Sequence, residues 1–76
     1  MPFEPLDSVV LLRDLPEHGL KAGDLGAIVH GHAADRFEVE FVRGSGQTQA
    51  VVTLGAADLR PISDRDLVSV RTVRGQ

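Results

Sequence analysis

The sequence contains no cysteine, tryptophan or tyrosine, and phenylalanine occurs only three times. Without cysteine, the disulfide bonds that stabilise many domains of this size are excluded. No apolar run approaches the ~18 residues that a membrane-spanning helix requires. The first residues also lack the cationic and apolar regions of a secretion signal. We therefore expect a cytoplasmic protein.

The charge balance is acidic, with 8 Lys and Arg against 11 Asp and Glu residues and a formal net charge of −3. This sign opposes general attraction to nucleic acid or to anionic lipid. A hydrophobic content of 42% is ordinary for a globular protein, and 76 residues are enough for one domain. We predict a single domain over residues 1–76.

Short runs of apolar and β-branched residues, separated by glycine and proline, predict an all-β fold. The clearest run is 36–43, in which Phe37, Val39 and Phe41 alternate with charged residues. We predict five antiparallel strands, over residues 8–14, 25–30, 36–43, 47–54 and 66–73, and one short helical turn over 55–59. A sheet of this size must curl to hide its edges, so a small SH3-like barrel is expected.

Five glycines are predicted to form structural turns: Gly19, Gly23, Gly26, Gly44 and Gly46. Gly44 and Gly46 are expected to supply the positive φ angles of a tight hairpin. The position of Gly26 just inside a strand indicates a bulge or a close backbone approach.

The order of the motifs also carries a resemblance. Residues 14–20 (DLPEHGL) followed by 23–26 (GDLG) are its most specific part, and FEVEF at 37–41 and LRPI at 59–62 continue it. The chain resembles a family of short bacterial proteins known as domain of unknown function 4926. The resemblance implies an SH3-like barrel and no particular activity. Part of the GDLG phrase also resembles the KOW motif of ribosomal proteins and transcription factors.

No residue set predicts catalysis, a cofactor or a metal. His18, His30 and His32 have no cysteine to complete a zinc site, and Gly31 favours a turn between the last two. The serines lack the context of an activated nucleophile. We therefore expect a protein that is not an enzyme.

The loop over residues 15–22 mixes apolar and charged side chains, as contact surfaces do. Its candidate partner-contact residues are Leu15, Pro16, Glu17, His18, Leu20 and Lys21. In the alternative, the two leucines pack on the barrel itself. The function expected is a non-catalytic protein-interaction module whose partner is unknown.

Nucleic-acid binding by a KOW-like, RNA-binding module is the alternative function. Small barrels bind single strands by stacking bases on exposed aromatic side chains in a basic groove. The aromatic residues are Phe3, Phe37 and Phe41, and the arginines that could form a basic edge are Arg36, Arg43, Arg60, Arg65, Arg71 and Arg74. Phe37 and Phe41 are expected in the core, where they cannot stack on bases, and this disfavours the alternative.

The predicted last strand, 66–73, has apolar residues on both faces. It could pair with an edge of its own barrel, beside residues 8–14, or with the same strand of a second copy to form a homodimer. We favour pairing within the chain, because it needs no partner, and the homodimer is the alternative.

Overall fold

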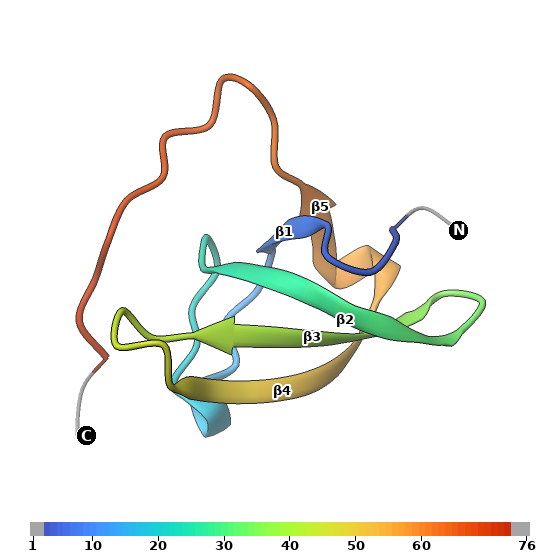
Figure 1. Ribbon diagram of the computed structural model, residues 1–76, viewed down its shortest axis with the longest axis horizontal. Helices are drawn as coiled ribbons and strands as arrows, with labels where there is room; N and C mark the ends of the chain where they lie inside the picture. The colour runs from blue at the N-terminus through green and yellow to red at the C-terminus, as the bar shows by residue number, and fades with distance from the viewer. Residues whose placement is uncertain (1–2, 74–76) are drawn as a thin grey trace.

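The computed structural model describes residues 3–73 (Figure 1). Its strands are β1 (Ser8–Leu11), β2 (Leu25–Ala33), β3 (Arg36–Val42), β4 (Thr48–Gly55) and β5 (Leu59–Pro61). Two 3-10 turns, η1 (Pro16–His18) and η2 (Ala56–Asp58), complete the regular structure. Among residues 3–73, no helix has the length and apolar character to cross a membrane.

The five strands form one antiparallel sheet in the order β4-β3-β2-β1-β5. The first and last strands are neighbours, because Val9 lies opposite Pro61 and Leu11 opposite Leu59. The sheet curls so that β5 lies beside β1, and η2 connects the end of β4 to β5 (Figure 1). The predicted all-β, SH3-like barrel is confirmed. The helical turn predicted over 55–59 is η2, whereas the second turn, η1, was not predicted.

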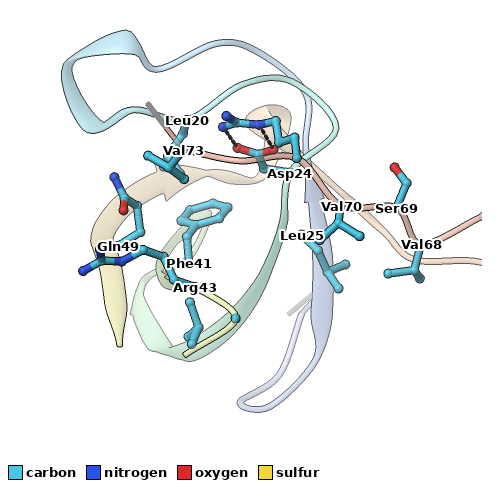
Figure 2. Close-up of a pocket in the computed structure, with 13 residues that line it drawn as sticks. Leu20, Asp24, Leu25, Phe41, Arg43, Gln49, Val68, Ser69, Val70 and Val73 are labelled. Atoms are coloured by element: carbon cyan, nitrogen blue, oxygen red, sulfur yellow. Dashed lines mark hydrogen bonds and ion pairs between the residues drawn. The ribbon is translucent and has the colours of Figure 1, made fainter. Parts of the chain in front are cut away.

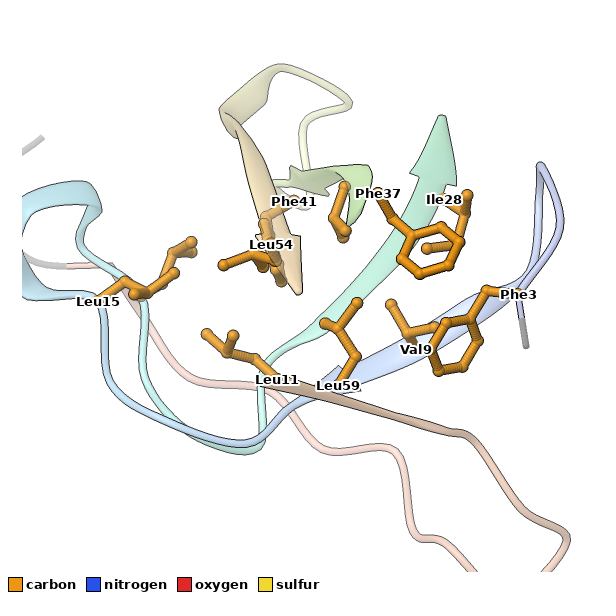
Figure 3. Packing of buried hydrophobic residues seen from close by; sticks show 11 residues of the cluster. Phe3, Val9, Leu11, Leu15, Ile28, Phe37, Phe41, Leu54 and Leu59 are labelled. Atoms are coloured by element: carbon orange, nitrogen blue, oxygen red, sulfur yellow. The ribbon is translucent and has the colours of Figure 1, made fainter. Parts of the chain in front are cut away.

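The core fills the inside of this curled sheet (Figure 3). Alternation places Phe37, Val39 and Phe41 inward from β3, where all three are buried. Phe3 joins them from the N-terminal side, and its ring meets that of Phe37 edge to face at 5.3 Å. The other buried residues of the cluster are Val9, Leu11, Leu15, Leu20, Ile28, Leu54 and Leu59.

The β3–β4 hairpin has a three-residue turn. The Gly46 amide donates to the Arg43 carbonyl at 2.8 Å, and the Arg43 amide donates to the Gln47 carbonyl at 2.8 Å. Gly46 has a φ of +93°, which favours glycine, whereas Gly44 does not have a positive φ. The predicted turn is correct, but the positive φ expected at Gly44 is wrong.

The last strand is not where the sequence pattern placed it. Residues 66–73 form no strand, and the fifth strand is Leu59–Pro61 instead. The reason is geometric, because β1 already has β2 on one edge and β5 on the other, and it has no free edge to offer. Residues 62–73, which we call the tail, leave the sheet and return along its outside (Figure 1).

Two other strand boundaries differ by three residues each, and those of the third and fourth strands differ by one residue. The first strand ends at Leu11 rather than at residue 14, and the second continues to Ala33 rather than ending at residue 30. The turn expected at Gly31 is therefore wrong, and the chain reverses only at residues 34–35.

Candidate functional site

The loop over residues 15–22 packs on its own barrel. Leu15 and Leu20 are buried, and their backbones exchange hydrogen bonds of 2.9 and 3.1 Å. Pro16 and Glu17 of η1 and the following Lys21 are exposed, while His18 is half-buried. Of the two arrangements expected for this loop, the structure has the leucines in the core. The six proposed contact residues thus do not form one continuous apolar surface.

Three glycines shape this end of the barrel in different ways. Gly19 ends η1 with a φ of +70°, and Gly23 turns the chain into β2 with a φ of +97°. Gly26 has no positive φ, but a Cβ there would lie 2.7 Å from Val39 Cγ1 and 2.8 Å from Phe41 Cε2. Gly26 lies inside β2, so the turn predicted there is wrong. The predicted close approach is present, because Val39 and Phe41 of β3 pack against its backbone.

A groove lies between this end of the barrel and the tail (Figure 2). It has a volume of about 310 Å³. The barrel side is lined by Leu20, Leu25, Phe41, Val42 and Gln49, and the tail side by Val68, Ser69, Val70 and Val73. Its lining combines apolar side chains with a few polar groups, as ligand and peptide grooves do.

Two arginine–aspartate pairs hold the tail against the barrel. At its start, Arg60 Nη1 and Nη2 donate to the two carboxylate oxygens of Asp66 at 2.8 and 2.9 Å. At its end, Arg71 Nε and Nη2 donate to those of Asp24 at 2.9 and 2.6 Å (Figure 2). Arg71 also donates to the Gly19 carbonyl at 2.9 Å. Bidentate pairs of this kind fix direction as well as distance.

The four residues between the two pairs, 67–70, are called the clamped segment. Its apolar side chains are exposed, almost fully for Leu67 (95%) and Val70 (98%) and largely for Val68 (70%). Within residues 3–73, no backbone hydrogen bond involves residues 67–70. The segment therefore exposes both apolar side chains and backbone groups without hydrogen-bond partners among residues 3–73.

We call the Arg60–Asp66 and Arg71–Asp24 pairs the two clamps. In each clamp the pKa of the aspartate carboxyl group is lowered. Hydrogen bonds from Arg60, and then from the Ser63 amide, hold the pKa of Asp66 well below its usual value. Burial raises the pKa of Asp24, but hydrogen bonds from Arg71 and from the Lys21 amide outweigh it, and the pKa is lowered. Both carboxylates are therefore ionised, and both clamps are intact, at neutral pH.

Sequence reasoning missed both clamps. Arg60 and Asp66 are six residues apart with opposite charge, and Ser63 between them suits a turn that ends in an aspartate cap. That signal was available. Asp24 and Arg71 are far apart in the chain, and no local pattern connects them.

The features required by nucleic-acid binding are weak in the described part of the chain. All three phenylalanines are buried, so none can stack on a base. Arg13, Arg60 and Arg71 are each paired with an aspartate. Arg74, one of the arginines proposed for a basic edge, lies outside the described residues.

The extension of β2 brings His30 and His32 to Glu38 of β3. His18, the third histidine, is elsewhere, and its carbonyl accepts a hydrogen bond from Gln49 Nε2 at 3.1 Å.

Comparison with known proteins gives a family and no further relative. The model of the family described as Domain of unknown function (DUF4926) matches residues 6–61. No curated protein and no solved structure matches the chain significantly. The matched range covers all five strands and ends where the tail begins.

Proposed function

Since the chain belongs to the DUF4926 family, which is defined by a domain of unknown function, we propose its function from the structure. The protein is a non-catalytic module that binds another protein through the clamped segment and the adjacent groove. The observation that carries this proposal is the exposure of Leu67, Val68 and Val70 on a backbone that is fixed at both ends.

Exposure of this kind is costly for an isolated molecule. Small soluble proteins rarely leave contiguous apolar groups in water, and where they do, the patch commonly marks an interaction site. The cost of burying such a segment in a partner is reduced when its backbone is already ordered. The two clamps supply that order, because each holds one end of the clamped segment in place.

The free backbone groups of the clamped segment indicate how it is recognised. An extended segment with unpaired N–H and C=O groups can add to an exposed edge of a partner's sheet, while its side chains fill pockets on that partner. The partner we propose is therefore a protein with an open strand edge beside an apolar surface. A second copy of this chain, as in the homodimer expected from sequence, is one such partner.

The absence of catalysis in this proposal is supported by the polar groups of the described residues. Among residues 3–73, no polar or charged residue is fully buried, whereas catalytic groups commonly sit in desolvated clefts with perturbed pKa values. The carboxyl groups with lowered pKa, Asp24, Asp58 and Asp66, are each explained by an arginine partner at the surface.

Affinity purification from the native host, read by mass spectrometry, tests the proposal. We expect the wild-type protein to retain a specific protein that the double variant Val68→Ser/Val70→Ser loses. The matched control is Val51→Ser, which changes a half-exposed valine on β4 outside the groove. Equal retention by all three proteins would contradict binding through the clamped segment.

Two solution measurements separate the alternatives. Light scattering measures the molar mass as the protein concentration is raised. A rise from the monomer to the dimer mass that the double variant does not show would identify the partner as a second copy. Binding of single-stranded RNA that weakens steeply with salt would instead favour the KOW-like alternative, because phosphate contacts release counterions. We expect no such RNA binding.

A further inference from the structure

Two irregularities in β2 create a cluster of side chains on the outer face of the sheet, made of residues that do not line the groove. The pairing of β2 with β3 shifts between Ile28 and His30, and again between Gly31 and Ala33. Each shift leaves one extra residue on β2, and the second extra residue is His32. Bulges of this kind re-aim side chains and are frequent at functional sites.

The pairing explains why two histidines meet one carboxylate. Glu38 lies between the inward-facing Phe37 and Val39, so it faces outward, and His30 lies directly opposite it. The second bulge brings His32 to the same carboxylate. Glu38 Oε2 is 3.8 Å from His30 Nε2 and 3.9 Å from His32 Nδ1, and ligand atoms of the three residues all lie within 4.8 Å of one another.

We propose that His30, His32 and Glu38 form a binding site for a divalent metal ion, and that the ion is Zn²⁺. Zinc bound to imidazole and carboxylate at about 2.0–2.2 Å places neighbouring ligand atoms roughly 3.3 Å apart. The distances here exceed that value by about half an ångström for the two Glu38 pairs. The ligand atoms of His30 and His32 lie within 4.8 Å of each other. Both histidines are exposed and Glu38 is half-buried, so we expect side-chain rotation to bring the three groups to one ion.

The donor set selects the class of metal. Two imidazole nitrogens and one carboxylate suit zinc and its neighbours in the transition series, whereas Mg²⁺ and Ca²⁺ require oxygen ligands. Three protein ligands leave at least one coordination position for water or for a donor from outside the chain. The site ties β2 to β3 at the end of the hairpin, where the two bulges interrupt regular pairing.

Calorimetric titration of the untagged full chain with ZnCl₂, in a buffer that does not chelate metal, tests this inference. We expect one Zn²⁺ per chain. Loss of a residue that only hydrogen-bonds to a metal ligand commonly lowers metal affinity by about 10- to 100-fold. His30→Ala and His32→Ala each remove a direct ligand, so each should lower the Zn²⁺ affinity at least tenfold. Glu38→Gln should also lower it. The matched control His18→Ala should bind as the wild type does.

A second readout places the ion. In ¹H–¹⁵N spectra, Zn²⁺ should shift the amide signals of residues 30–38 and leave those of residues 67–70 unchanged. Circular dichroism of the metal-free variants checks that each is folded. No binding at millimolar Zn²⁺, equal affinity in all variants, or one Zn²⁺ per two chains would each overturn the proposed site.

Discussion

The barrel and its tail are held in place by different interactions. The barrel, residues 3–61, is stabilised by a core in which Phe37, Val9 and Leu11 have no exposed surface. The tail, residues 62–73, leaves Leu67, Val68 and Val70 in water and is attached through the arginine pairs of Asp66 and Asp24. Hydrophobic burial does not depend on pH, whereas ion pairs depend on both pH and salt. The two parts should therefore respond to different perturbations.

The largest difference is expected from truncation of an apolar side chain in each part. Phe37→Ala should lower the free energy of unfolding by about 3–5 kcal/mol. This is comparable with the net stability of about 3–5 kcal/mol that a core of this size supplies, so the variant should be largely unfolded. Leu67→Ala should have almost no effect. Urea unfolding followed by far-ultraviolet circular dichroism measures both, since the chain has no tryptophan or tyrosine to report fluorescence.

A comparison of glycines sharpens the picture of the barrel. Gly26→Ala places a methyl group against Val39 and Phe41, and overpacking of this kind costs about 1–3 kcal/mol. Gly44→Ala meets nothing within 4 Å and has no positive φ to lose, so its unfolding free energy should match the wild type. Gly23→Ala should cost about 1 kcal/mol for a different reason, its left-handed backbone. Equal thermal midpoints for Gly26→Ala and Gly44→Ala would contradict the packing argument.

Acidification should loosen the tail before it unfolds the barrel. The pKa values of Asp24 and Asp66 are lowered in the folded protein, so the ionised carboxylates contribute stability at pH values above their unfolded pKa of about 3.9. That contribution is lost as the pH falls below about 4 and approaches the lowered values. Asp58, whose pKa is lowered chiefly by its hydrogen bond from Arg13, should add a smaller barrel response in the same range.

Hydrogen exchange at pH 6 and pH 3 separates these responses. Among the tail amides, those of Ile62 and Asp66 donate backbone hydrogen bonds, and they should lose protection at pH 3 while the β3 amides keep theirs. Simultaneous loss of protection in both parts would show that tail and barrel open together.

The smallest expected effect on stability comes from a single clamp. Asp24→Asn removes the charge that pairs with Arg71 and should release the end of the tail. Because exposed ion pairs contribute little to stability, the thermal midpoint should hardly change. NMR relaxation should nevertheless show faster motion of residues 67–70. The exposed tail residue Asp64, changed to asparagine, is the control and should alter neither measurement.

The strands that could be predicted are those whose information is local. Phe37, Val39 and Phe41 alternate strictly, and the Gly44 to Gly46 turn follows at once, so β3 and its hairpin were predictable. The β5 strand was not, because it has three residues and ends in Pro61. Proline is tolerated there since β5 lies at the edge of the sheet.

The tail shows the limit of local pattern. Its alternation resembles a strand, but a strand also needs a free edge, and β1 had none left. The same limit applies to the two candidate sites. The Asp24–Arg71 clamp and the approach of His32 to Glu38 depend on tertiary placement and on a bulge, and neither is encoded in spacing along the chain.

The pairing of β1 with β5 has a consequence for synthesis on the ribosome. Val9 cannot pair with Pro61 until nearly the whole domain has been made. Phe3, Val9 and Leu11, which belong to the core of the folded protein, are synthesised much earlier. Contacts between distant parts of a chain also slow folding. During translation strands β1 to β4 should therefore pair first, leaving the second edge of β1 unpaired and the core without Leu59 until β5 is made. A nascent chain stalled before Leu59 should be a substrate for chaperones, and one released beyond Pro61 should not.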